Sequence, residues 1–347
     1  MNANSYFHRV HDQTPTRFWI NNVTEEEARL AIEAGAVGCT QNPSYVWKMM
    51  QASPEAVFSL LDDILDAYPD DNEALIELQK QLIERIAAIF LPIWEKTHGR
   101  SGHVTIQGDP FDERAANIVR QGVANCRNYP NLSAKVPVTE EGLKAIPELA
   151  AQGITLTMTE VMSVQQAMDA CDAWGKATAD LAVRPVAYLA HIPGIFDEYL
   201  QHYVADNKID IEPDILWQAG VAVSKKVHDL MRQRLTPVHF MAGGARGLHH
   251  FTEIVGAQGF VTINWKGTAD DLIKQDPPVV QRFLQPTPPA VLDRLMLQLD
   301  EFRRAYWLKG LEPADYEHYG PVVLFRTSFE KAWRQALEAV TDRRRNR

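Results

Sequence analysis

The chain has 347 residues, of which 46% are hydrophobic and 23% charged, so it can bury a large core and is not dominated by disorder. Its formal net charge of −10 disfavours an extended surface for DNA or RNA. Cys39, Cys126 and Cys171 are too few for a disulfide framework, and they lack the spacing of a thiolate zinc site.

Neither end of the chain carries a membrane signal. The first sixteen residues lack the apolar core of a signal peptide, and no later segment is apolar for long enough to span a bilayer. We therefore expect a soluble protein of the reducing cytoplasm, with no membrane partner. The one basic cluster, at residues 343–347, is interpreted as a solvated tail and not as a nucleic-acid-binding segment.

Short β-rich runs alternate with longer amphipathic stretches along the chain, which is the pattern of βα units around a parallel sheet. Thr24 and Glu27 have the spacing of a capping box ahead of an apolar stripe, and Thr139 opens a second helix after the fourth run. The predicted strands are residues 17–21, 37–41, 103–107, 133–137, 155–160, 185–191, 237–243 and 260–264.

The eight strands predict a (β/α)8 TIM barrel formed by a single domain, residues 1–347. Residues 43–100 show helical patterns without a strand, so extra helices are expected after the second strand. Residues 288–340 are also helical and follow no flexible linker, which predicts C-terminal helices packed on the barrel. Their aromatic residues are interpreted as core or interface, with Tyr319 a candidate lid, and their surface could support a homo-oligomer by analogy with other barrels.

Lys135 lies in the middle of an apolar run, residues 132–138, that reads as a buried strand. A lysine is rarely buried unless it is paired, so one interpretation is a side chain that reaches the strand end or a carboxylate. The other is a desolvated amine, whose lowered pKa gives the neutral nucleophile that Schiff-base chemistry requires.

Polar residues stand at nearly every carboxyl end of the predicted strands, where barrels gather their function. Amides, hydroxyls, one lysine and one histidine there predict a pocket for a polyhydroxylated ligand, although strand ends are also polar because they approach solvent. The adjacent His249 and His250 would point different ways on a helix, and no metal or nucleotide motif is present, so neither a metal nor a cofactor is predicted. The strand-end residues are Asn21, Thr40, Asn42, Gln107, Lys135, Thr159, His191, residues 243–246 and Asn264.

Three segments resemble the transaldolase family. Residues 38–44, Gly-Cys-Thr-Gln-Asn-Pro-Ser, are similar to its second-strand Thr-x-Asn-Pro-Ser/Thr motif, residues 131–146 to its Schiff-base segment, and residues 153–159 to the strand that follows. The resemblance covers roughly residues 18–263 in the same order, and the C-terminal helices match only loosely.

The resemblance implies a class I aldol mechanism. Lys135 would form an imine with a ketose or its phosphate, and retro-aldol cleavage would leave a dihydroxyacetone unit that is transferred to an aldehyde or released. Thr40 and Asn42 would fix the sugar hydroxyls, and Thr159 matches the threonine that holds the catalytic water.

This chain departs from the family at its proton-transferring groups. Gln107 stands where many transaldolases have a third-strand glutamate and where the aldolase branch has glutamine, and Asn21 replaces the first-strand aspartate. Neither amide can take a proton. His191, at about the place of a tyrosine in the aldolase branch, is a candidate acid or base, unless it is a packed imidazole. Asp109 and Glu160 are further candidates, although strand alternation would point Glu160 away from the pocket unless the strand has ended before it.

The phosphate-binding residues are also incomplete. Arg246 matches the second phosphate arginine, and Gly244 leaves backbone N–H groups open to an anion, but the sixth-strand arginine has no counterpart in residues 192–195. A sugar phosphate is still the leading substrate, with Lys266, His249 or His250 as compensating cations. The alternative is a sugar-binding or regulatory barrel that kept the lysine pocket and lost turnover.

Overall fold

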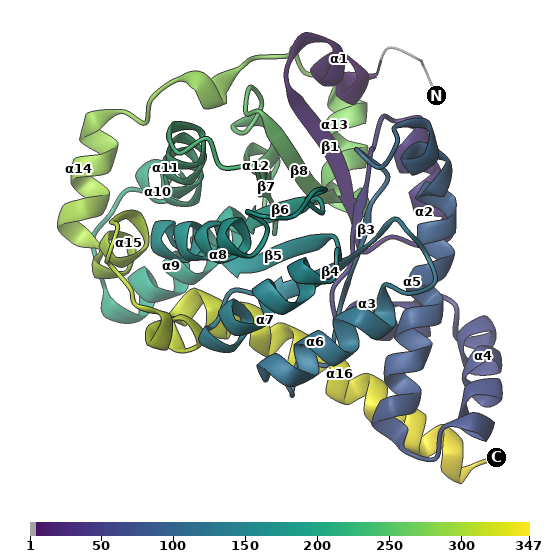
Figure 1. Cartoon of the computed structure of the whole chain (residues 1–347). Coiled ribbons are helices and arrows are strands. Elements are labelled where there is room, and N and C mark those ends of the chain that lie inside the picture. The colour runs from purple at the N-terminus through teal and green to yellow at the C-terminus, as the bar shows by residue number, and fades with distance from the viewer. Residues whose placement is uncertain (1–4) are drawn as a thin grey trace.

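A computed structural model describes residues 5–347, and its sheet is a closed barrel of eight parallel strands in chain order. The last strand pairs with the first to close the ring (Figure 1). The eight predicted strands and the (β/α)8 class are thereby confirmed. The strands are β1 (Thr16–Asn21), β2 (Cys39–Thr40), β3 (Val104–Gln107), β4 (Leu132–Pro137), β5 (Leu156–Val161), β6 (Ala187–His191), β7 (His239–Ala242) and β8 (Gly259–Asn264).

Two of the helices that follow the strands, α2 (Glu25–Glu33) and α7 (Glu140–Ala151), begin at the capping residues that the sequence predicts. Thr24 Oγ1 accepts the Glu27 N–H at 3.2 Å, and the Thr24 N–H donates to Glu27 Oε2 at 3.0 Å. Thr139 Oγ1 accepts the Gly142 N–H at 3.1 Å in the same way. The helices that follow the strands are α2, α6 (Ala115–Asn125), α7, α8 (Val164–Ala177), α9 (Pro193–Asn207), α10 (Pro213–Leu216), α11 (Ala219–Gln233), α12 (His249–Thr252) and α13 (Asp270–Gln275).

Extra helices stand after the second strand, as predicted, and before the first strand, where none was predicted. The connection from β2 to β3 carries α3 (Tyr45–Ala52), α4 (Pro54–Ala67) and α5 (Asp71–Lys96). The additional helix α1 (Tyr6–Gln13) precedes β1, and its Phe7 ring stacks on Phe18 with the centroids 3.9 Å apart. Aromatic packing therefore holds this N-terminal helix against β1.

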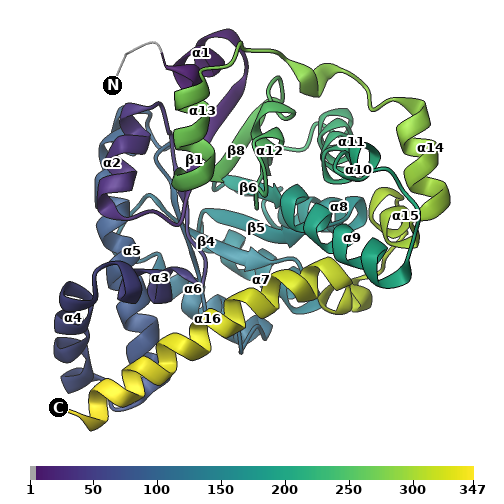
Figure 2. The ribbon, with the colours of Figure 1, turned by 180° about the vertical axis from the view of Figure 1, so that it is seen from behind.

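The C-terminal block is helical and contains α14 (Pro289–Gln298), α15 (Asp300–Tyr306) and α16 (Gly320–Arg345). Figure 2 shows α16 crossing one face of the molecule from the α9 side to α4. Its basic end is largely exposed, as the sequence predicts, but it is helical as far as Arg345 and is held by ion pairs: Arg343 Nη2 lies 2.6 Å from Asp62 Oδ2, and Arg344 Nε lies 2.5 Å from Asp71 Oδ1. Within residues 5–347, none of the helices has the length and apolar character needed to cross a bilayer.

The interior of the barrel has an aromatic end and a polar end. Near the amino ends of the strands, Trp19, Tyr188 and Phe260 pack edge to face, with ring centroids 5.0 to 5.6 Å apart. Successive inward positions nearer the carboxyl ends are polar, among them Asn21 and Thr262. The aromatic layer fills the interior below the polar positions, so the polar groups are presented toward the carboxyl ends of the strands.

Candidate active site

A cavity of about 210 Å³ lies at the carboxyl ends of the strands, and α16 forms part of its wall. It brings together residues from β1, β2, β4 and β5 and the loop after β7. Phe325, Ser328 and Phe329 of α16 also line it, and sequence reasoning missed all three, because nothing in a helical pattern tells where the helix docks. Seven of the nine predicted site residues line the cavity: Asn21, Thr40, Asn42, Lys135, Thr159, Gly244 and Arg246.

Lys135 is buried, with 8% of its surface exposed, and its amine faces this cavity. Its Nζ lies 5.9 Å and 5.6 Å from the ring centroids of Phe325 and Phe329. Among residues 5–347 it has no hydrogen-bond acceptor and no carboxylate within bonding distance, so it forms no ion pair there. Burial lowers its pKa to about 8, although Glu160 and Glu113 act to raise it. Roughly a tenth of the amine is therefore neutral at pH 7.

Two threonines of β5 stand beside the lysine. Thr157 is paired in register with Lys135, and its hydroxyl shares a hydrogen bond of 2.8 Å with Ser133. The Thr159 hydroxyl is buried and has no partner among the described residues. A buried hydroxyl normally finds a partner, so Thr159 is positioned to hold a water molecule or a substrate oxygen in the cavity.

Asn21 is held in a network of neutral groups across β1, β2 and β8. Its Nδ2 donates to Asn264 Oδ1 at 2.8 Å, and its Oδ1 accepts from Thr40 Oγ1 at 2.9 Å. The Thr40 hydroxyl also shares a hydrogen bond of 2.7 Å with Thr262. The network fixes the orientation of these amides and hydroxyls, which suits binding of sugar hydroxyls, but it contains no group that exchanges a proton near neutral pH.

The loop after β2 presents the amide of Asn42. Its Oδ1 accepts from Asn22 Nδ2 at 3.0 Å and from the N–H of Ser44 at 3.0 Å. The carbonyl side of the amide is thus used to shape the turn, and the Nδ2 side is left as a donor at the cavity wall.

His191 does not reach the cavity. Ala190 and Ile192 line the cavity, so strand alternation turns His191 outward, where its Nδ1 shares a hydrogen bond of 2.7 Å with Ser224 of α11. Burial lowers the pKa of this imidazole to about 3, which keeps it neutral. The expectation that His191 supplies the acid or base is therefore corrected: it is a packed imidazole between strand and helix.

Gln107 also lies outside the wall of this cavity, although it is one residue across the sheet from Lys135. Its backbone pairs in register with Lys135, and its buried side chain donates from Nε2 to Glu160 Oε1 at 3.0 Å. Glu160 itself is fully buried on the inner side, against the expectation from strand alternation.

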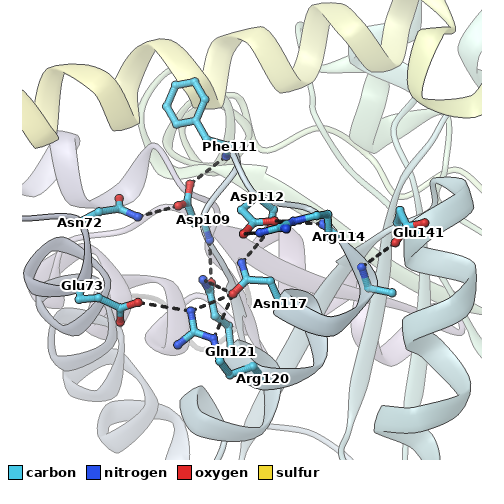
Figure 3. Close-up of polar contacts among 11 residues, drawn as sticks. Asn72, Glu73, Asp109, Phe111, Asp112, Arg114, Asn117, Arg120, Gln121 and Glu141 are labelled. Carbon is cyan, nitrogen blue, oxygen red and sulfur yellow. Dashed lines mark hydrogen bonds and ion pairs between the residues drawn. The ribbon is translucent and has the colours of Figure 1, made fainter. Parts of the chain in front are cut away.

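Asp109 is committed to the loop that follows β3 (Figure 3). Its Oδ2 accepts from Asn72 Nδ2 at 2.7 Å and its Oδ1 from the Phe111 N–H at 2.8 Å. Its own N–H donates to Gln121 Oε1 at 2.8 Å. With both carboxylate oxygens engaged in holding α5 and the loop together, Asp109 is not available as a base.

Arg246 lies at the cavity wall but already has an anionic partner. Its Nε is 2.6 Å from Glu198 Oε2. The turn before it needs glycine at Gly244, where φ is +67° and an added Cβ would lie 2.5 Å from Ile192 Cγ2. None of the other cations considered for phosphate, Lys266, His249 and His250, lines the cavity.

Asp197, His249 and His250 bring three ligand-type atoms within 4.8 Å of one another. The Arg246 N–H donates to His250 Nδ1 at 3.2 Å, so His250 carries its proton on Nε2 and donates it to Asp197 Oδ2 at 3.0 Å. Asp197 Oδ1 accepts the Gly220 N–H at 2.6 Å. A metal would need the lone pair of Nε2 that this tautomer lacks, so the cluster is better suited to holding the Arg246 turn in place.

Comparison with known proteins agrees with this geometry. Residues 18–294 match the family described as Transaldolase/Fructose-6-phosphate aldolase. The chain is 28% identical over 221 residues to a transaldolase of Acidothermus cellulolyticus, covering 59% of this chain and 58% of that protein. It is 24% identical over 348 residues to transaldolase 1 of Streptomyces avermitilis, covering 93% and 91%.

A third relative, a transaldolase of Thermobifida fusca, is 28% identical over 192 residues, 51% of each chain. In two of the three relatives, the matched segment thus spans little more than half of the protein. The family match covers most of the barrel, including the β4 segment with Lys135 and the β5 segment with Thr159. This chain therefore belongs to the transaldolase/fructose-6-phosphate aldolase family.

Proposed function

We propose that the chain is a class I enzyme that cleaves and forms a carbon-carbon bond of ketoses or ketose phosphates through an imine on Lys135. The observation that carries this proposal is the buried, unpaired amine of Lys135 in a cavity lined by neutral hydrogen-bonding groups. Family membership supports the same reaction class. A dihydroxyacetone unit would remain on the lysine after cleavage, either passed to an aldehyde or released.

The residues of the cavity suit the steps of such a reaction. The neutral fraction of Lys135 adds to the ketone, and loss of water gives an iminium that draws electrons from the neighbouring carbon-carbon bond. Asn42, Thr40 and Asn21 present amides and a hydroxyl that can position the sugar chain, and Phe325 and Phe329 keep bulk water from the imine.

Support for a phosphate group on the substrate rests on Arg246 alone. Its guanidinium lines the cavity, but Glu198 competes for it, and a phosphate would have to displace that carboxylate or share the arginine with it. We favour a ketose phosphate as the substrate. Comparing it with the same ketose without phosphate tests whether the phosphate group contributes to binding.

Borohydride trapping tests the imine. The protein is incubated with fructose 6-phosphate, fructose or dihydroxyacetone and then reduced with borohydride. The mass of the intact chain is measured by mass spectrometry. We expect a mass increase for one reduced ketose, lost in Lys135→Met and kept in Lys144→Met, which removes an exposed lysine of α7. No adduct with any ketose would overturn the proposal. Product formed with and without an aldehyde acceptor then separates transfer from release.

A second candidate function is favoured by Asn21, the amide that replaces the first-strand aspartate of the family. A barrel without that acid could bind sugars and form the imine while turning over poorly. An adduct on Lys135 without measurable cleavage would support this regulatory or sugar-binding function.

A further inference from the structure

Glu160 stands at an irregularity in β5 that turns its side chain inward. The pairing of β5 with β6 shifts register between Met158 and Val161, and Glu160 has φ +60°, in the left-handed region. A residue with a Cβ atom is strained in that region of backbone conformation. The carboxyl group that it turns inward is fully buried and hydrogen-bonded to Gln107 across β4. Such strain is typical of functional sites.

Several charged or titratable groups face this carboxyl from the surrounding elements. Lys135 faces it from β4, Glu113 from the loop before α6, and Arg326 and Glu330 from α16. Burial raises the pKa of Glu160, while Gln107, Lys135 and Arg326 act to lower it. Burial and the charge of Glu160 together raise the pKa of Glu113 well above its ordinary value. The site is therefore built to retain a proton on a carboxyl beside the lysine.

Several buried oxygens of Glu160 and of the residues near it in the fold lack a hydrogen-bond partner among the described residues. Glu160 Oε2, Gln107 Oε1, Glu113 Oε2 and the Thr159 hydroxyl are buried without a hydrogen-bond partner among residues 5–347. Three of the four can only accept unless a carboxyl is protonated. A protonated carboxyl supplies one donor. Glu160 itself does not line the cavity, so its proton would reach the reacting atoms by way of the Thr159 hydroxyl, which does line it.

We propose that Glu160 is the acid and base of the lysine site, with Gln107 as the residue that positions it. This rests on the proposed function. After the Lys135 amine has added to the ketone, the Glu160 carboxyl gives its proton to the carbinolamine hydroxyl, the C–O bond breaks, and water and the iminium are formed. When the imine is hydrolysed, the resulting carboxylate takes a proton back from the attacking water.

The other candidates for this proton are excluded by their surroundings. His191 faces α11, and both oxygens of Asp109 are engaged in the β3 loop. Asn21 and Gln107 are amides and cannot transfer a proton under these conditions. The only carboxyls that act on the charge of Lys135, among the described residues, are Glu160 and Glu113, and Glu113 is the more exposed of the two.

Glu160→Gln tests the assignment, because the new amide oxygen can still accept from Gln107 Nε2 while the proton is lost. We expect ketose cleavage to fall by roughly 100-fold or more, in the range of general acid-base catalysis. The limb of the kcat-pH profile that reports a carboxyl should disappear. Borohydride trapping of Lys135 should still be reached on long incubation, because the amine remains, but the adduct should build up more slowly than in wild type, because Glu160 acts in imine formation.

Glu330→Gln is the matched control. It removes a carboxylate of α16 that faces Glu160 but does not itself hydrogen-bond to Gln107. We expect the rate of ketose cleavage to change by less than threefold. If Glu160→Gln does not fold, as judged by thermal unfolding, the exchange variant Gln107→Glu with Glu160→Gln keeps one carboxyl and one amide in contact. It should retain at least a tenth of the wild-type turnover, and less than a hundredth would overturn the assignment.

The two proposals fail differently. A wild-type protein that is never trapped by borohydride defeats the imine on Lys135 and the role of Glu160 with it. A wild-type protein that is trapped, beside a folded Glu160→Gln variant that cleaves at the wild-type rate with an unchanged pH profile, defeats the role of Glu160 alone.

Discussion

Lys135 shows how a single side chain can favour function at the expense of stability. Its folded-state pKa of about 8 lies below the ordinary 10.5, so between these pH values the unfolded chain binds more protons than the folded one. Stability must therefore rise with pH across this window. Below pH 8, burying the charged amine lowers the free energy of unfolding by about 3 kcal/mol.

Lys135→Met removes that cost and fits a flexible apolar chain beside Phe325 and Phe329. We expect the variant to be inactive and, at pH 7, more stable than wild type by up to about 3 kcal/mol, with the difference vanishing near pH 10.5. Denaturant unfolding at pH 7, 9 and 10.5 measures this. Lys144→Met, in an exposed ion pair, should show no such pH-dependent gain. A Lys135→Met protein that is less stable at every pH would contradict the burial of the charge.

Residue identity in the sequence predicts most of the cavity wall, because strand alternation places Asn21, Thr40 and Lys135 on one face of the barrel. The same alternation applied to His191 turns it outward, which the strand-end argument overlooked. Glu160 could not be found this way, since its inward turn depends on a left-handed backbone that glutamate does not favour by itself.

At the scale of elements, α16 supplies the apolar cover of the lysine. Phe325 and Phe329 are one helical turn apart, so both rings face the strand ends from the same side of the helix. The candidate lid Tyr319 is instead buried at the start of α16, where its hydroxyl donates to the Glu301 carbonyl at 2.6 Å.

Phe329→Leu should let water approach Lys135 and move its pKa back toward the ordinary value. We expect the pH midpoint of borohydride trapping to rise and the trapping rate at pH 7 to fall several-fold, with a stability loss of about 1 to 2 kcal/mol. Phe302→Leu, an equally buried ring of α15, should lose similar stability without moving the midpoint. Identical midpoints in the two variants would show that α16 does not set the acidity of the lysine.

The order of elements was predictable, and their docking was not. Alternating patterns and caps locate the strands and the helices α2 and α7, because these signals are local. The two-residue length of β2 and the path of α16 depend on contacts between segments far apart in the chain. The apolar stripe of a helix in residues 320–345 would be the same whether the helix packed against the side of the barrel or over the carboxyl ends of its strands.

In the whole molecule, α16 joins the lysine cavity to the helices inserted after β2. Its first half packs over the strand ends, and its second half pairs with α4 and α5 through Arg343 to Asp62 and Arg344 to Asp71. Trp333, between these halves, donates from Nε1 to Asn72 Oδ1 at 2.9 Å. The inserted helices α4 and α5 thus bind the far half of α16, the helix that covers the site.

The double change Asp62→Asn with Asp71→Asn should loosen the far half of α16 and leave the cavity covered. The four side chains are 26 to 43% exposed, so each pair contributes only about 0.2 to 1 kcal/mol, and high salt should reduce the effect further. We expect faster amide hydrogen exchange in residues 335–347, with turnover unchanged because Phe325 and Phe329 are held by the core.

Asp112→Asn, which breaks an ion pair in the exposed β3 loop, is the control and should leave exchange in α16 unaltered. Exchange measured by mass spectrometry at low and high salt separates the outcomes. If the double variant exchanges like wild type, Asp62 and Asp71 do not hold the far half of α16 in place. If it loses turnover as well, the two halves of α16 behave as one unit, and the cover of the lysine depends on the whole length of the helix.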